Sequence, residues 1–242
     1  MAMKKMSVSA AGEPILVWDA PVRVFHWLLV LSFAGAYLTA ESERWHLVHI
    51  TLGYTMGGLV AFRIVWGLVG SRYARFTDFV KPVAAVRRYV ASLLARKPEH
   101  HVGHNPAGGL AILGLLVLAI AVTVTGWATD NDAREWMEEA HEAAANVMLG
   151  LVALHVAAVI GSSWLHRENL VGAMLHGFKR GGPGEGIRSP RRLVAVLVMA
   201  AVAGFWGLQW FGSSTGSGLA IGAGHSVHGE QGKHENRSGD DD

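Results

Sequence analysis

Residues 141–165 read HEAAANVMLGLVALHVAAVIGSSWL, an apolar run with one histidine at its start and another near its middle. From Ala143 to Leu165 the run contains no Asp, Glu, Lys or Arg. A helix needs roughly 20 apolar residues to cross a bilayer, because it rises about 1.5 Å per residue. The stretch therefore predicts a transmembrane helix over 143–165.

Four further runs of similar length lie elsewhere in the 242-residue chain, of which 51% is hydrophobic. They cover about 22–40, 47–69, 107–128 and 193–212. A water-soluble domain of this size would not carry five such runs separated by charged stretches. We therefore expect an all-α integral membrane protein, in which four transmembrane helices form a bundle and a fifth transmembrane helix follows it.

The charged residues differ in sign from one connecting segment to the next. Stretches 70–104 and 166–192 are rich in Lys and Arg, whereas 41–45 and 129–142 are rich in Asp and Glu. Positively charged loops stay on the cytoplasmic side of a bacterial membrane. The pattern predicts a multi-pass protein of the bacterial inner (plasma) membrane, with a cytoplasmic N-terminus and a periplasmic C-terminus.

The same patterns divide the chain into four parts. Residues 1–16 are the expected cytoplasmic N-terminus, which lacks the apolar core and small-residue cleavage site of a signal peptide. Residues 17–180 hold the four-helix core, and 181–212 hold a basic loop and the fifth helix. Residues 213–242 are rich in Gly and Ser and are expected to form a disordered periplasmic tail. The alternative for the tail is weak metal binding by its histidines, which are His225, His228 and His234.

A shorter helical pattern lies inside the basic stretch 70–104. Pro82 suits the start of a helix, and apolar residues recur after it at helical spacing, with basic residues between them. The pattern predicts a cytoplasmic helix that lies along the membrane surface. Its apolar positions are Val83, Val86, Val90, Leu93 and Leu94.

The chain contains no cysteine and 13 histidines. The lack of thiols excludes disulfides, iron–sulfur clusters, thiolate-bound zinc and covalently attached haem. Any metal or cofactor must therefore be held by His, Met or oxygen ligands. Because ionisable side chains are costly inside a bilayer, intramembrane histidines are candidates for a functional role. The candidates are His26, His49, His141 and His155.

The spacing of these histidines indicates two paired sites. His141 and His155 are 14 residues apart, so they share a helix face to within about 40° and lie roughly 21 Å apart along the axis. Matching by depth pairs His49 with His141 near the outer side, and His26 with His155 near the cytoplasmic side. A six-coordinate haem iron needs one ligand on each face, and helix bundles build such sites from facing helices. We therefore expect two non-covalent b-type haems with bis-His ligation.

Two arginines are candidates for binding the propionates of the cytoplasmic-side haem. Arg63 follows His49 by 14 residues, so it faces nearly the same way but lies deeper. Arg23 precedes His26 by one turn. In a low dielectric a propionate needs a charged partner, and an arginine suits that role. The alternative for Arg63 is a residue at the end of its helix that extends to the interface.

Other histidines remain as alternatives. His46 lies one turn before His49 and faces about 60° away, which makes it the main rival for that ligand position. His166 is a candidate for a quinone site at the cytoplasmic boundary, and a lone intramembrane histidine can also simply hydrogen-bond a carbonyl. The other candidates for the quinone site are Arg167, Arg23 and Trp18. The histidines expected to be solvated or interfacial are His100, His101 and His104.

Several stretches resemble bacterial cytochrome b561-type proteins and the b-type cytochrome subunits of nickel–iron hydrogenases. Residues 17–27 (VWDAPVRVFHW) resemble the opening of these proteins, and residues 49–54 (HITLGY) resemble their second helix. Residues 103–109 (GHNPAGG) resemble the start of the third helix, and His141 and His155 match the fourth. The resemblance extends from about residue 17 to 180.

The resemblance implies a haem-bearing core of four helices that passes electrons between a quinone pool and a partner protein in respiratory electron transport. The haem ligands of the family correspond to the four candidate histidines. The implied partners are membrane lipid, quinone or quinol, and either a periplasmic c-type cytochrome or a hydrogenase subunit. No role with nucleic acid is expected. The acidic outer loop around Trp136 is a candidate docking surface for a basic partner.

Two other functions are compatible with the sequence. A self-contained quinol-dependent oxidoreductase would oxidise quinol without a partner protein. A transporter or metal permease would use the histidines as cation ligands and would purify without haem. An electron-transfer subunit or a quinone-linked oxidoreductase is expected in preference to a hydrolase or a transferase.

Overall fold

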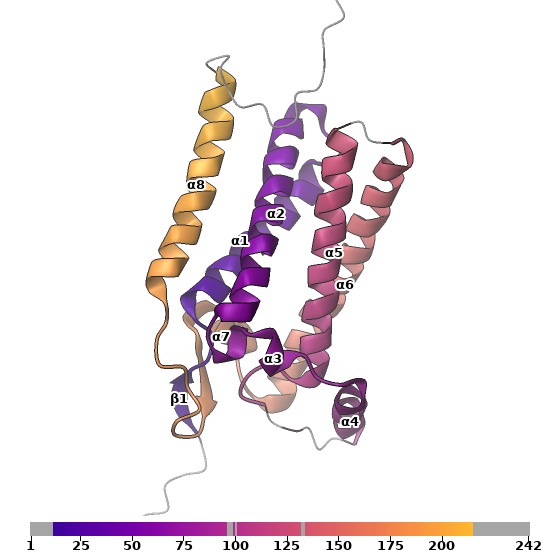
Figure 1. Cartoon of the computed structure of the whole chain (residues 1–242). Helices are drawn as coiled ribbons and strands as arrows, with labels where there is room; N and C mark the ends of the chain where they lie inside the picture. Colours follow the sequence, from indigo (N-terminus) through magenta and orange to yellow (C-terminus); the bar gives the residue numbers. More distant parts are fainter. Residues whose placement is uncertain (1–11, 96–98, 100, 132–133, 215–242) are drawn as a thin grey trace, which may run out of the picture.

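The computed structural model describes residues 12–95, 99, 101–131 and 134–214. The expected N-terminal segment up to residue 11 and the expected tail from residue 215 lie outside the described residues. Within the described part, five helices are long and apolar enough to cross a membrane (Figure 1). The predicted all-α integral membrane fold is confirmed. The five are α1 (Ala20–Thr39), α2 (His46–Val69), α5 (Pro106–Asp130), α6 (Trp136–His166) and α8 (Arg192–Ser214).

Capping residues explain where two of these helices begin. Asp19 precedes α1, and its Oδ1 accepts a backbone N–H of the first turn at 2.9 Å. Asn105 precedes α5, and its Oδ1 accepts a backbone N–H in the same way at 2.7 Å. Pro21 and Pro106 occupy the first turns, where a missing N–H does no harm. The cap and proline together fix the start of each span.

The fourth span is longer than the sequence pattern predicts. α6 begins at Trp136 instead of residue 143, so part of the expected acidic loop is helical. Glu138 and Glu139 lie in its first turn, where carboxylates complement the positive end of the helix dipole. His141 therefore lies within α6 and not at its opening, and His155 shares the same continuous helix.

The first four spans pack as two pairs. α1 packs along α2, α5 packs along α6, and α2 joins the pairs through α5. α8 lies outside this bundle against α1, as Figure 1 shows. Phe33, Met56 and Met148 meet in the bundle core with Ala119 and Val122. The expected bundle of four helices followed by a fifth helix is thus present.

Both basic segments lie at one end of the bundle, where short elements form a cap (Figure 1). We call this the basic end, and the other end, where α1 and α5 finish and α2 and α6 begin, the acidic end. Strand β1 (Glu13–Leu16) pairs antiparallel with β2 (Phe178–Gly181), an arrangement that the sequence analysis did not predict. The pairing ties the residues before α1 to those after α6. The other cap elements are η2 (Arg72–Ala74), α3 (Phe76–Phe79), α4 (Val83–Leu94) and α7 (Leu170–His176).

The predicted helix in the basic stretch corresponds to α4, which lies across the direction of the spans at the basic end (Figure 1). Tyr89 is only 2% exposed and fixes one face of α4 against the bundle, with its ring 5.6 Å from that of His101. Val83 and Val90 are exposed. Its contact with a membrane surface stays a prediction.

Candidate functional site

His49 of α2 and His141 of α6 face each other near the acidic end, and we call them the acidic-end pair. Their ring centroids are 6.1 Å apart, and their planes are inclined at 86°. Two imidazoles bonded at about 2 Å to opposite sides of one metal ion place their centroids roughly 6 Å apart. The separation therefore fits two axial ligands of one iron.

In both rings of the acidic-end pair, Nδ1 forms a hydrogen bond with a backbone carbonyl. Nδ1 of His49 lies 2.8 Å from the carbonyl oxygen of Ala36, and Nδ1 of His141 lies 3.0 Å from that of Val122. A carbonyl can only accept, so each Nδ1 carries the proton and each Nε2 has a free lone pair. Metal-bound histidines almost always donate their second N–H to such a carbonyl or to a carboxylate. The acidic-end pair fits a haem iron in this respect too.

Helix α5 forms a recess for the ring of His141. A Cβ atom on Gly126 would lie 2.8 Å from Cε1 and 3.1 Å from Nδ1 of His141. The hydroxyl of Thr125 also lies 3.3 Å from this Nδ1. The ring can approach α5 closely because residue 126 has no side chain. The groups that orient the ring are an uncharged carbonyl and a hydroxyl.

The structure separates His49 from its rival on the same helix. His46 is exposed at the start of α2, whereas His49 is partly buried and donates to the carbonyl of Ala36. Only His49 has His141 opposite it within the described contacts. The geometry therefore favours His49 as the ligand candidate.

His26 of α1 and His155 of α6 lie toward the other end, and we call them the basic-end pair. One turn from each, Leu29 and Val152 pack against the same apolar cluster, so the two histidines lie at similar depth. The ring of His26 contacts Trp27, at 5.0 Å between centroids. Its Nδ1 is buried and has no hydrogen-bond partner among the described residues. A buried polar atom without a partner indicates a site that a bound group completes.

An apolar layer separates the two pairs. Their histidines on α6 are 14 residues apart, which corresponds to roughly 21 Å along the helix. Met148 lies midway, is 2% exposed, and packs with Phe33 and Met56. The bundle therefore holds two polar sites at different depths with a dry core between them.

Arg63 is 4% exposed, so it does not extend to the interface. Its Nη1 donates to the carbonyl of Ala74 at 3.0 Å. The guanidinium also lies 5.4 Å from the ring centroid of Phe76 and 5.5 Å from that of Phe79. These contacts hold the segment after α2 against the end of that helix. Arg63 thus has a structural role at the basic end, whatever else it binds there.

Arg23 reaches the same end of the bundle from α1. Its Nη1 donates to the carbonyl of Leu175 at 2.6 Å. Its Nε is buried and has no hydrogen-bond partner among the described residues. Arg23 therefore keeps a donor with which it can bind an anionic group.

Asp19 is a buried acid whose role the sequence analysis missed. It is fully buried, and besides capping α1 it accepts a hydrogen bond from Nε1 of Trp66 through Oδ2 at 3.0 Å. This bond joins the start of α1 to the end of α2, beside Arg63. An acid within a VWDAP sequence signals a helix cap, but nothing in the sequence identifies Trp66 as its second partner.

His104 is packed inside the cap, which corrects the expectation of a solvated or interfacial residue. Its ring lies 4.4 Å from that of Trp18, and its Nδ1 is buried without a partner among the described residues. Burial, and then the charges of Arg63, Lys179 and His155, lowers the pKa of His104 to about 3. The ring is therefore neutral near pH 7 and lies in the neighbourhood of the basic-end pair.

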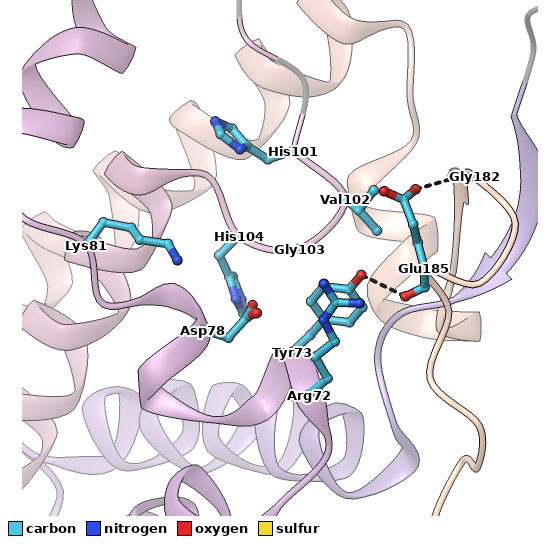
Figure 2. Close-up of a pocket in the computed structure, with 11 residues that line it drawn as sticks. Arg72, Tyr73, Asp78, Lys81, His101, Val102, Gly103, His104, Gly182 and Glu185 are labelled. Atoms are coloured by element: carbon cyan, nitrogen blue, oxygen red, sulfur yellow. Dashed lines mark hydrogen bonds between the residues drawn. The ribbon is translucent and has the colours of Figure 1, made fainter.

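A polar pocket of about 390 Å³ opens at the basic end, and His104 forms part of its lining (Figure 2). Glu185 lies at one side, where its carboxylate accepts the N–H of Gly182 at 2.6 Å and its carbonyl accepts the hydroxyl of Tyr73 at 2.7 Å. The pocket carries charges of both signs and so has no clear preference for an anion or a cation. Its charged lining residues are Arg72, Asp78, Lys81 and Glu185.

Comparison with known proteins identifies the family. The family of prokaryotic cytochrome b561 matches residues 17–177. A "Probable Ni/Fe-hydrogenase 1 B-type cytochrome subunit" of Escherichia coli (strain K12) is 29% identical over 140 residues, which cover 46% of this chain and 58% of that protein. A "Probable Ni/Fe-hydrogenase B-type cytochrome subunit" of Azotobacter vinelandii is 29% identical over 164 residues, covering 53% and 67%. The similarly named protein of Bradyrhizobium diazoefficiens is 23% identical over 220 residues, covering 69% and 87%.

No solved structure significantly matches the chain. The family match covers well over half of the sequence, so the chain belongs to the prokaryotic cytochrome b561 family. The resemblance seen in the sequence is confirmed, and the chain is a multi-span membrane cytochrome with b-type haem as its cofactor.

Proposed function

We propose that this member of the cytochrome b561 family is a di-haem electron-transfer protein that connects the two faces of the membrane. His49 and His141 would be the axial ligands of one haem, and His26 and His155 those of the other. The observation that supports this most is the acidic-end pair, with rings 6.1 Å apart and both Nδ1 atoms bound to carbonyls. The b-type haem, when bound, supplies a one-electron iron couple whose potential depends on its ligands and their hydrogen bonds.

The residues of the chain orient the ligands and exclude water. Carbonyls of α1 and α5 fix the two rings of the acidic-end pair. The core around Phe33 and Met148 keeps the space between the pairs dry. At the basic end, Arg23 has a free donor for a propionate, and Arg63 adds positive charge in a buried position. Propionate binding by either arginine is part of the proposal.

We infer that the basic end faces the cytoplasm. Both basic segments lie at the same end of the bundle, and the acidic turns lie at the other (Figure 1). The positive-inside rule then gives a cytoplasmic N-terminus and places the end of α8 on the periplasmic side. The acidic-end pair would lie near the periplasm.

The next redox centre in the chain of electron transfer must belong to another protein, because this chain has no cysteine for an iron–sulfur cluster. The names of the relatives suggest a nickel–iron hydrogenase as the partner, and a periplasmic c-type cytochrome is the alternative. Trp136 is 53% exposed at the acidic end, beside Glu138 and Glu139. A partner with a basic surface would suit this region.

Quinone exchange would take place at the basic end. His166 and Arg167 end α6 there, and Arg23 lies close to α7. Trp18 is a weaker candidate than the sequence suggests, because it is 6% exposed and packs against Tyr73 and His104. The quinone site itself is a proposal that rests on the family and on these positions.

The experiment is to purify the full chain in mild detergent, measure haem per chain, and record reduced-minus-oxidised spectra during a redox titration. We expect two b-type haems per chain with separate potentials. A colourless protein would overturn the proposal and favour a cation transporter. Steady quinol oxidation by the purified chain with an added electron acceptor, but without a partner protein, would instead show a self-contained oxidoreductase.

A further inference from the structure

We propose that Thr125 is a positioning residue for the haem at the acidic end. Its hydroxyl shares the Nδ1 proton of His141 with a backbone carbonyl and thereby lowers the reduction potential of that haem. The inference rests on the proposed function, because it requires His49 and His141 to be axial ligands. It goes further by assigning the control of one haem to one side chain.

The geometry makes the hydroxyl of Thr125 an acceptor for His141. Its Oγ1 lies 2.7 Å from the carbonyl oxygen of Ala121 and 3.3 Å from that of Val122, so the hydroxyl directs its only hydrogen at carbonyls of its own helix. A lone pair of Oγ1 is therefore left for Nδ1 of His141, 3.3 Å away. The same Nδ1 lies 3.0 Å from the carbonyl oxygen of Val122. One N–H is thus shared between two acceptors on α5, and the hydroxyl is the weaker of the two.

Thr125 is the acceptor that a substitution can remove. Among the described residues, the two Nδ1 atoms of the acidic-end pair have three acceptors, which are the carbonyls of Ala36 and Val122 and the hydroxyl of Thr125. The carbonyls belong to helix backbone and persist whatever the side chain is. Gly126 gives the His141 ring room to approach all of these groups on α5.

A hydrogen bond accepted from Nδ1 raises the electron density on the imidazole and makes Nε2 a stronger ligand. Ferric iron carries one more positive charge than ferrous iron, so a stronger donor stabilises the ferric form and lowers the potential. The hydroxyl therefore adds to the effect of the Val122 carbonyl. His26 at the other end has no acceptor for its Nδ1 among the described residues, and Thr125 contacts His141, so its effect should fall on the acidic-end haem.

The experiment compares Thr125→Val, which removes the hydroxyl and keeps the shape, with Thr125→Ser, which keeps the hydroxyl. Thr123→Val is the matched control, because the hydroxyl of Thr123 donates to the carbonyl of Ala119 at 2.8 Å and does not contact a candidate ligand. Each full-length protein is purified with its haem, titrated electrochemically and examined by electron paramagnetic resonance. The acidic-end haem is identified as the component of the parent spectrum that is missing from the spectrum of His141→Ala.

In Thr125→Val we expect a roughly threefold rise in the ratio of reduced to oxidised acidic-end haem at a fixed potential. A threefold change in this ratio corresponds to a rise of about 28 mV in the reduction potential of a one-electron couple. The ferric signal of that haem should also shift, while Thr125→Ser and Thr123→Val should match the parent protein. The potential of the other haem should not change in any variant.

An unchanged potential in Thr125→Val would overturn the inference, and so would an equal shift of both haems, which a general distortion of α5 would cause. If Thr125→Val does not retain haem, Thr125→Ala removes the same hydroxyl with less bulk, and the same comparison applies. Failure of the proposed function looks different, because the parent protein itself would then lack haem or would keep its full haem content after His141→Ala.

Discussion

The two ends of the bundle hold their histidine pairs in different ways. At the acidic end the connections between spans are short, and carbonyls of α1 and α5 orient both rings directly. At the basic end a cap of strands and short helices closes the bundle, and Asp19, Arg63 and Lys179 are buried there. The difference teaches that the transmembrane helices themselves orient both rings at the acidic end, whereas at the basic end we expect the folded cap to contribute.

This contrast predicts that damage to one end leaves the other end intact. The rings of the acidic-end pair need only α1, α2, α5 and α6, whose contacts continue through the core around Met56. The cap at the other end instead joins segments far apart in sequence, since β1 near the start of the chain pairs with β2 after α7. The four predictions below test this separation, in order of decreasing effect.

The largest effect should follow from removing a ligand. His141→Ala should lose the acidic-end haem and halve the haem content, because haem iron loses one axial bond and the ring on the facing helix has no partner. His26→Ala should lose the other haem and keep the first. Haem per chain and reduced spectra measure both outcomes.

His46→Ala is the matched control for the second helix, since His46 is exposed and one turn from His49. Its haem content should equal that of the parent, whereas His49→Ala should match His141→Ala. Loss of haem in His46→Ala together with full haem in His49→Ala would reverse the ligand assignment on α2.

A smaller but still local effect should follow from filling the recess on α5. Gly126→Ala would place Cβ 2.8 Å from Cε1 of His141, a distance that forces the ring or the helix to shift. We expect a partial loss of the acidic-end haem, with the remainder more easily lost on dilution. Gly161→Ala on α6 is the control, because a Cβ there meets nothing within 4 Å. Equal haem loss in the two variants would show that the effect is not specific to the recess.

The sequence predicts those features that are local or periodic. The spans follow from length and hydropathy, and the α-helical period places His141 and His155 on one face of α6. The sequence predicts this span from residue 143, whereas α6 begins at Trp136, because the acidic residues at 138 and 139 resemble a loop but stabilise the first turn of a helix.

The basic-end cap could not be predicted, because its contacts join distant segments. Ile15 pairs with Lys179 across almost the whole chain, and each strand has only four residues. His104 appears solvated in the sequence, since it lies in a basic loop with glycine and asparagine. Its burial depends on Trp18 and on Phe79, which come from two other segments.

The third prediction concerns the stability of the cap. Asp19→Ala removes the cap of α1 and leaves Nε1 of Trp66 without its partner. Together these losses should lower the free energy of unfolding by about 3 kcal/mol. Asp19→Asn should lose less, because an amide oxygen can still cap the helix. Thermal unfolding in detergent measures the stability of the parent protein and the two variants. Equal stability of Asp19→Ala and the parent would contradict the prediction.

The smallest effect should be the coupling between Lys179 and Glu168, which links β2 to the turn after α6. Nζ of Lys179 lies 3.4 Å from Oε2 of Glu168 and donates to the carbonyl of His101 at 3.2 Å. Burial lowers the pKa of Lys179, while Glu168 opposes that shift, and both side chains are largely shielded from water. Lys179→Met, Glu168→Gln and the double variant form a thermodynamic cycle, in which we expect a coupling energy of about 1 kcal/mol.

The same cycle decides whether the two ends are independent. Lys179→Met should weaken the cap and broaden the spectrum of the basic-end haem, while the potential of the acidic-end haem stays as in the parent. The reason is that no residue of β2 or its partner strand belongs to the contacts that orient His49 and His141. A matching shift at the acidic end in Lys179→Met would show that the cap acts through the whole bundle, and that the transmembrane helices alone do not fix the acidic-end ligands.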